Sequence, residues 1–231
     1  MFKRKHFWAL LAVLLAVPPL TVSAADLDSV LDKMDQAAGR FTGMEAKITR
    51  MKYMALLDSK DTESGVMYVR REDKGKVRMA IHFQEPSVYY LAINGDKAEI
   101  YRPRIATVEE YNIAKQRDAF QGGLLLGFGT SAKYLRDTYD LRILGEESVG
   151  DRKTVRMELV PKSADTRKQL PKLEIWVSTE TWQAVQQKLH QPGGEDYRVF
   201  TYSDIKLNPK LSDSVFNLGI PKNAKRIFPQ K

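Results

Sequence analysis

The segment QGGLLLGFGTSAKYL, residues 121–135, combines four glycines with three consecutive leucines and the start of a predicted helix. Gly122 and Gly127 have the spacing of a phosphate-binding P-loop, and the G-x-G-x-x-A run from Gly127 to Ala132 has that of a dinucleotide fingerprint. A P-loop requires lysine where Phe128 stands. A dinucleotide site requires a preceding strand and a crossover helix to a parallel strand, and the flanking sequence predicts neither. We therefore predict no nucleotide site here.

Other residues that could do chemistry are sparse. The chain has no cysteine and none of the common hydrolase motifs. The carboxylate pairs Glu109–Glu110 and Glu146–Glu147 lie on predicted strands, where neighbouring side chains point to opposite faces. His82 and His190 are too few for a zinc site, and the alternation around His82 predicts that it is exposed. We therefore expect neither an enzyme nor a metal ion or other cofactor.

The same glycine-rich segment is strongly apolar. Leu124, Leu125, Leu126 and Phe128 are flanked by glycines that free the backbone. One interpretation is a buried turn of the core, because most apolar runs simply pack. The other is a mobile lid that covers an apolar cavity and retracts for a ligand. The sequence leaves both open.

The elements that must position this segment are mostly strands. Residues 27–41 have the periodicity of an amphipathic helix, with Gly39 and Gly43 as expected stops. Short alternating segments follow, and Asn94-Gly95 is a strong hairpin signal. A second helical region surrounds the glycine-rich segment between residues 114 and 139. The predicted strands are residues 46–57, 65–71, 76–83, 88–93, 97–102, 106–113, 141–147, 154–160, 173–177, 184–189 and 197–207.

The connections between these strands are too short for crossovers, so we expect an antiparallel sheet. Ten or eleven strands in one sheet leave exposed edges unless the sheet curls. The predicted fold is therefore mainly β with helices: an unclosed, strongly curved antiparallel barrel covered by a helical lid, with room for an apolar hollow.

The N-terminus resembles a secretory signal peptide. Lys3, Arg4 and Lys5 precede an apolar run that is broken by Pro18, and small residues follow. This run is too short for a membrane span, so we predict cleavage after about residue 25 rather than an uncleaved anchor. Residues 26–231 would then form one domain in the periplasm, and the formal charge would fall from +8 to +5 through loss of the three basic residues. This balance favours transient contact with anionic membranes or acidic partners over nucleic acid, or it serves solubility alone.

The predicted first helix, which ends in Phe41, and four later segments resemble a known family in their order and spacing. The four segments are GVMYVRR from Gly65, KVRMAIHFQEP from Lys76, INGDKAEIYRP from Ile93 and VFNLGIPKNAKRI from Val215. The family is that of the periplasmic outer-membrane lipoprotein carriers and their lipoprotein-sorting relatives. Glu72 replaces a proline of the family pattern and Ile100 replaces its tryptophan, so the chain resembles a divergent relative.

The resemblance implies a half-barrel whose apolar cavity binds acyl chains under a helical lid. It also implies that Arg71 tethers the lid in the closed state. The residues expected to contact lipid are Met67, Val69, Met79, Ile81, Leu91, Ile100, Leu124, Leu125, Leu126, Phe128, Leu135, Leu173 and Ile175. Which face of the strands lines the cavity is not determined by the pattern.

Three functions are compatible with this outline. The first is a monomeric periplasmic carrier that takes acyl chains of lipoproteins, or other lipids, from an inner-membrane donor complex to an outer-membrane acceptor. The second is a soluble lipid-sensing module of the cell envelope with the same fold. The third, an exported lipid hydrolase, lacks a recognisable nucleophile and base.

Overall fold

The computed structural model describes residues 26–72, 77–114 and 125–229. Its helices are α1 (Leu27–Arg40), α3 (Ala132–Thr138) and α4 (Ala164–Gln169). The strands are β1 (Gly43–Met54), β2 (Ser59–Arg71), β3 (Val77–Glu85), β4 (Tyr89–Asn94), β5 (Lys97–Arg102), β6 (Thr107–Asn112), β7 (Tyr139–Val149), β8 (Arg152–Pro161), β9 (Leu173–Ser178), β10 (Ala184–His190), β11 (Tyr197–Leu207) and β12 (Lys225–Ile227).

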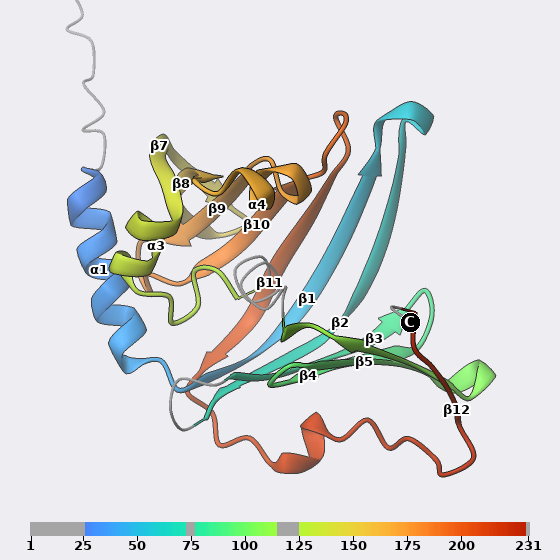
Figure 1. Ribbon diagram of the computed structural model, residues 1–231. Coiled ribbons are helices and arrows are strands. Elements are labelled where there is room, and N and C mark those ends of the chain that lie inside the picture. Colours follow the sequence, from blue (N-terminus) through green and yellow to red (C-terminus); the bar gives the residue numbers. More distant parts are fainter. Residues whose placement is uncertain (1–25, 73–76, 115–124, 230–231) are drawn as a thin grey trace, which may run out of the picture.

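The strands of these described ranges form one twelve-stranded sheet in the order β12-β6-β5-β4-β3-β2-β1-β11-β10-β9-β8-β7. The sheet curves strongly and does not close, because β12 and β7 remain at its edges (Figure 1). The predicted unclosed half-barrel with helices is therefore confirmed, with slightly more strands than expected. The eleven predicted strands pair antiparallel as expected, and the additional short strand β12 pairs with β6 in parallel.

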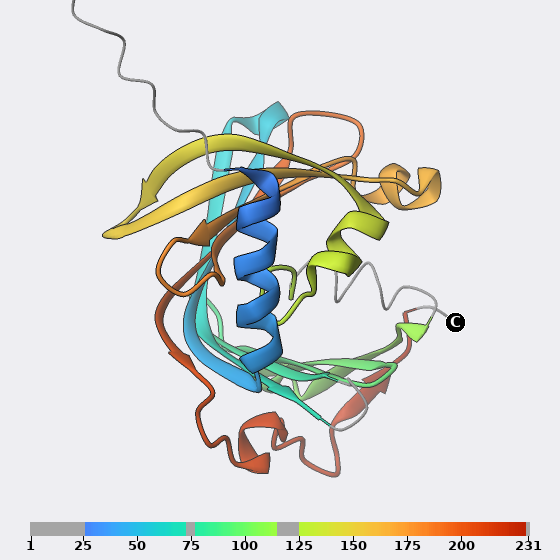
Figure 2. The ribbon, with the colours of Figure 1, turned by 90° about the vertical axis from the view of Figure 1, so that its left-hand side faces the viewer.

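Helix α1 lies across one end of the curved sheet, at the left in Figure 1 and toward the viewer in Figure 2. Asp26 caps its first turn by accepting a hydrogen bond from the Ser29 amide at 3.4 Å. Its apolar stripe, which includes Val30, Leu31 and Met34, is almost fully buried. The helix ends at Arg40 because Phe41 adopts an extended conformation. No glycine stops it, contrary to the sequence-based expectation.

Two apolar clusters fill the concave side of the sheet. The first contains inward-facing side chains of β1, β2 and β3 together with Phe41, Phe200 and Tyr202. The second joins α1 and α3 to β8, β9 and β10. The segment 125–130 contributes to both clusters, since Leu125 and Phe128 belong to the first and Leu126 to the second. This segment therefore lies where the two halves of the core meet.

The C-terminal segment after β11 covers part of the convex side of the sheet (Figure 1). Its short 3-10 helix, Asp213–Phe216, places Phe216 between two arginines, with the Arg70 and Arg78 guanidinium carbons 5.0 and 4.9 Å from the ring centroid. His82 lies beneath the same segment, and its Nε2 is 3.0 Å from the Val215 carbonyl oxygen. His82 is thus half-buried, and the expectation that it is exposed is wrong.

Candidate functional site

The concave face of the sheet collects the described residues that the sequence predicts to bind lipid. Leu124 lies outside the described residues. Six of the others belong to the first cluster, and Leu91 and Ile100 pack against it. The six are Met67, Val69, Met79, Ile81, Leu125 and Phe128. The second cluster holds Leu126, Leu135, Leu173 and Ile175. The predicted residues therefore share one side of the sheet but fall into two neighbouring groups.

The segment 125–130 covers this apolar face. The Phe128 ring lies edge-on to Tyr202, with centroids 5.0 Å apart, and 6.4 Å from the ring of Phe41. Leu125 and Phe128 are 9% and 5% exposed, so both are part of the packed interior in this conformation. A ligand that reaches the strands beneath them must displace these two side chains.

Two glycines allow this segment to lie so close to its neighbours. Gly127 has φ +87°, and a Cβ built on it would be 2.7 Å from the Ala184 Cβ. Gly129 has φ +64°, and its Cβ would be 2.5 Å from Arg71 Nη2 and 2.6 Å from the Phe41 ring. Left-handed backbone and close approach both require glycine, so these positions build the turn itself.

Buried amides hold the segment to β10. Gln187 is fully buried, and its side chain donates to the Leu126 carbonyl oxygen while accepting a 3.0 Å hydrogen bond from the Tyr202 hydroxyl. Gln183 accepts a 3.3 Å hydrogen bond from the Gly129 amide. Burial raises the pKa of Tyr202, which keeps its hydroxyl protonated as a donor. Sequence reasoning missed both glutamines. Gln187 lies on a predicted strand and Gln183 immediately precedes it, and neither position carries a signal that its amide is buried.

Arg71 connects the segment to α1. Its Nη2 donates to the Gly129 carbonyl oxygen at 2.6 Å, and its Nη1 donates to the Ala38 carbonyl oxygen at 3.3 Å. The guanidinium carbon also lies 5.8 Å from the centroid of the Phe41 ring. A cation is favourable at the carboxyl end of a helix, where carbonyl groups lack helical partners. One side chain thus links helix, loop and sheet.

The concave face becomes charged toward the free end of the β1–β2 hairpin. Arg50 pairs with Glu63 across the two strands, and the Tyr89 hydroxyl lies 2.9 Å from Arg50 Nη2 and 3.0 Å from Glu63 Oε2. Burial raises the pKa of Tyr89. A pocket of about 320 Å³ lies at this end and is lined by Arg50, Lys52, Asp61, Glu63 and Arg198.

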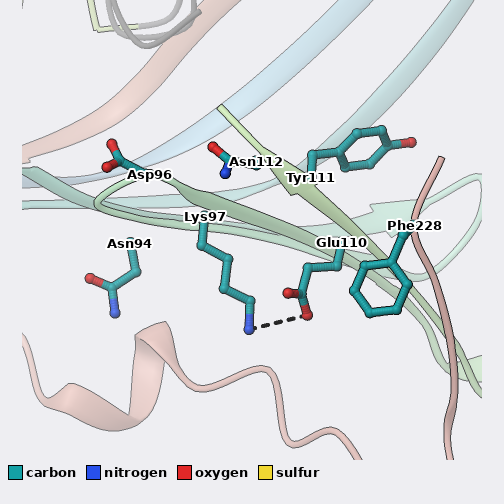
Figure 3. Close-up of a pocket in the computed structure, with 7 residues that line it drawn as sticks. All are labelled: Asn94, Asp96, Lys97, Glu110, Tyr111, Asn112 and Phe228. Atoms are coloured by element: carbon teal, nitrogen blue, oxygen red, sulfur yellow. Dashed lines mark ion pairs between the residues drawn. The ribbon is translucent and has the colours of Figure 1, made fainter. Parts of the chain in front are cut away.

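A second pocket, of about 410 Å³, lies at the β4–β5 turn (Figure 3). It is lined by Asn94, Asp96, Lys97, Glu110, Tyr111, Asn112 and Phe228. Lys97 pairs with Glu110 at 3.3 Å and with Glu99 at 2.8 Å, and Arg226 from β12 pairs with both carboxylates. These charges neutralise one another across the edge strands, an arrangement that stabilises the unclosed edge rather than offering a site for an apolar ligand.

The described residues contain no group of three or more histidine or acidic side chains that could hold a metal ion. Among the same residues, no helix is both long and apolar enough to cross a membrane.

Solved structures show which fold this chain shares. MucB matches with a TM-score of 0.54 and 14% identity, covering 85% of this chain and 64% of MucB. An uncharacterized conserved protein from Thermus thermophilus matches with a TM-score of 0.55 and 10% identity, covering 87% of this chain and 98% of the other. This chain therefore spans less than two thirds of MucB, and the likeness to both proteins shows a common fold.

The similar structures also include a LolA-superfamily protein from Nitrosomonas europaea, with a TM-score of 0.41 and 15% identity over 82% of this chain and 96% of that one. No curated protein matches the sequence significantly. A family model described as "Uncharacterized protein" matches residues 75–217, which is more than half of the chain. The chain therefore belongs to the family that this model describes.

Proposed function

We propose that this protein is a periplasmic carrier that binds the acyl chains of lipoproteins or other lipids on its concave face. It takes them from a donor complex at the inner membrane and releases them to an acceptor at the outer membrane. The residues that contact the chains are those of the two apolar clusters beneath the segment 125–130. This segment acts as a lid, and Arg71 tethers it when no lipid is bound.

One observation carries the proposal: an apolar face is covered by a glycine-hinged segment that polar groups hold in place. Leu125 and Phe128 fill the space above the strands, while Arg71 and Gln183 bind the backbone of Gly129. A turn that served only packing would not need a long arginine reaching across from another element. Such contacts can be exchanged for water when the segment retracts.

The free energy gained by burying an acyl chain is large enough to offset the cost of displacing the segment 125–130. Exposing Leu125 and Phe128 costs about 1.5–3 kcal/mol each, and each lost hydrogen bond costs about 1 kcal/mol. Burial of an acyl chain contributes about 0.8 kcal/mol per methylene group. A chain of ten or more methylenes therefore offsets lid opening, whereas a short chain does not. We expect affinity to rise steeply with chain length.

The direct experiment is to purify the protein from membranes and identify co-purified molecules by mass spectrometry. We expect acyl-bearing species in stoichiometric amount. A protein that is empty and also fails to bind a fluorescent fatty acid would exclude the proposal. A protein that binds lipid but does not transfer it between membrane fractions would be a lipid-sensing module rather than a carrier.

A second experiment tests the lid. Leu125→Arg places a charge beneath the segment and should abolish uptake of the fluorescent fatty acid while circular dichroism shows a folded protein. Ile105→Arg is the matched control, because Ile105 is 62% exposed and lies away from the concave face. Normal uptake by folded Leu125→Arg would contradict the lid, and loss of folding would identify the segment as a fixed core turn.

A further inference from the structure

The inward-facing side of β1 changes character partway along the strand. Met44, Ala46 and Ile48 are at most 1% exposed and belong to the first cluster. Because side chains two residues apart share a face, Arg50 and Lys52 continue the same row toward the end of the hairpin. An extended ligand along this row meets apolar side chains first and then, within about 13 Å, cations.

Within this row, Arg50 already has partners in the protein. It pairs with Glu63 and the Tyr89 hydroxyl, and its guanidinium carbon lies 5.0 Å from the centroid of the Phe83 ring. Phe83 belongs to the apolar cluster. The Arg50–Glu63 pair therefore marks the boundary between the apolar region and the pocket beyond it.

Beyond this boundary the pocket of about 320 Å³ presents Lys52, Asp61 and Arg198. Lys52 of β1 is directly opposite Asp61 of β2 on one side and Arg198 of β11 on the other. None of these three side chains makes an ion pair with any residue that the structure describes. The pocket thus holds two cations and one carboxylate that are available to a ligand.

We propose that this pocket binds the phosphoethanolamine headgroup of a phospholipid whose acyl chain lies on the apolar face. Lys52 and Arg198 bind the phosphate, and Asp61 accepts hydrogen bonds from the ammonium group. The inference rests on the proposed lipid-binding function and specifies its substrate class. Charge-assisted hydrogen bonds between these groups are short and directional, so they select a headgroup where apolar burial alone would not.

The charges favour this zwitterion over a purely anionic ligand. Asp61 and Glu63 line the pocket together with the cations, so an added negative charge without an ammonium group meets repulsion as well as attraction. The pocket volume is near the lower limit of small-molecule sites, which is about 300 Å³. It accommodates a headgroup, and its continuity with the apolar row places the chain on the cluster.

The test compares ligands that share one acyl chain, each displacing a fluorescent fatty acid from the full mature protein. They are lysophosphatidylethanolamine, lysophosphatidylglycerol and monoacylglycerol. We expect lysophosphatidylethanolamine to bind about tenfold or more tightly than monoacylglycerol, with lysophosphatidylglycerol between them. Glycerophosphoethanolamine, which has the headgroup without the chain, should displace the probe only weakly. Displacement as strong as that by the lipid would indicate a soluble phosphate ester and overturn the proposal.

Variants test which side chains contact the phosphate and the ammonium group of the headgroup. Lys52→Gln/Arg198→Gln should reduce lysophosphatidylethanolamine binding to the level of monoacylglycerol and leave monoacylglycerol unchanged. Asp61→Asn should weaken lysophosphatidylethanolamine without weakening lysophosphatidylglycerol. The control, Lys60→Gln/Lys206→Gln, removes the same charge from the opposite face, where Lys60 pairs in register with Tyr53 and Lys206 with Glu45.

The outcomes separate the headgroup inference from the carrier function. Equal affinity for lysophosphatidylethanolamine and monoacylglycerol in the wild type would overturn the headgroup site and leave the acyl carrier standing. A preference that survives in Lys52→Gln/Arg198→Gln would also overturn it. If no acyl ligand displaces the probe or the probe itself does not bind, the proposed function fails and the inference fails with it.

Discussion

Arg71 and Gly129 are joined by a 2.6 Å hydrogen bond from the guanidinium Nη2 to the glycine carbonyl oxygen, across 58 residues of sequence. Gly129 permits this approach, since a Cβ at that position would lie 2.5 Å from the same nitrogen. The other terminal nitrogen of Arg71 reaches the end of α1 at Ala38. The segment 125–130 and the helix are therefore fastened to β2 by one side chain.

Replacing Arg71 should loosen the lid. Arg71→Leu removes both hydrogen bonds and leaves the two carbonyl oxygens in a half-buried region, so we expect the free energy of unfolding to fall by about 1–3 kcal/mol. Fluorescent fatty acid should bind faster and more tightly, because the closed, lipid-free state loses contacts that the open, lipid-bound state lacks. Stopped-flow mixing measures the rate of uptake.

Arg70→Leu is the matched control for this experiment. Arg70 is the preceding residue on the opposite face, where it pairs with Asp213 and Glu72 and stacks on Phe216. Its loss should destabilise the attachment of the C-terminal segment without changing the rate of lipid uptake. An equal rate for Arg71→Leu and the wild type would show that Arg71 does not control the lid.

Alternation along the sequence predicts most of the sheet because most strands have one face in the core, although β9 is buried on both faces. The predicted boundaries of β5 and β11 coincide with those in the structure. Alternation misses the start of β2 because its first six residues, 59–64, are polar and pair with the charged part of β1. Strand β12 has only three residues and no apolar pattern; it pairs in parallel because the C-terminal segment returns to the edge at β6.

The sequence predicts the candidate site less completely. Apolar residues such as Met67 and Ile81 can be assigned to the concave face because burial follows from their type and spacing. Gln187 cannot be assigned to the concave face in this way, since an amide in a strand is usually exposed. Its burial depends on hydrogen bonds with the Leu126 carbonyl group and the Tyr202 hydroxyl. These partners come from distant segments, so only the tertiary structure reveals them.

Gly127 should be among the least tolerant glycines of the described segments. Gly127→Ala forces a side chain into left-handed backbone and into contact with Ala184. We expect destabilisation by about 2–4 kcal/mol, measured by chemical denaturation, from strain and overpacking together. Gly150→Ala, with φ +60° and open space around the Cβ, isolates the strain and should cost about 1 kcal/mol. Equal losses in the two variants would mean that the segment 125–130 does not pack tightly against β10.

Glu174 on β9 is a carboxylate that is 3% exposed. Burial raises its pKa, but hydrogen bonds from His190 and Arg156 outweigh burial, so the pKa lies below its ordinary value. Glu174→Gln should destabilise the protein by about 1–3 kcal/mol in thermal or chemical unfolding. The comparison variant is Arg142→Gln, which breaks an ion pair between Arg142 and Glu158. The Arg142 side chain is 68% exposed, so this change should have little effect on stability. Comparable effects from both variants would show that the buried position of Glu174 adds nothing.

His82 should make the attachment of the C-terminal segment depend on pH. Burial lowers its pKa from the ordinary value of 6.5, although the hydrogen bond to the Val215 carbonyl oxygen opposes this. The unfolded chain therefore binds more protons than the folded chain as pH falls through 6.5. The contribution of His82 to stability is complete above that pH, and it declines from there until pH passes below the folded pKa.

His82→Gln tests this dependence because glutamine can still donate to the Val215 carbonyl group but does not titrate. Unfolding free energies of the two proteins should be similar near pH 8 and should diverge toward about pH 5, with the wild type losing more. Limited proteolysis within residues 208–229 should show the same divergence, since this segment lies over His82. Parallel stability curves over this range would mean that folding does not change the pKa of His82, so this histidine does not make stability depend on pH.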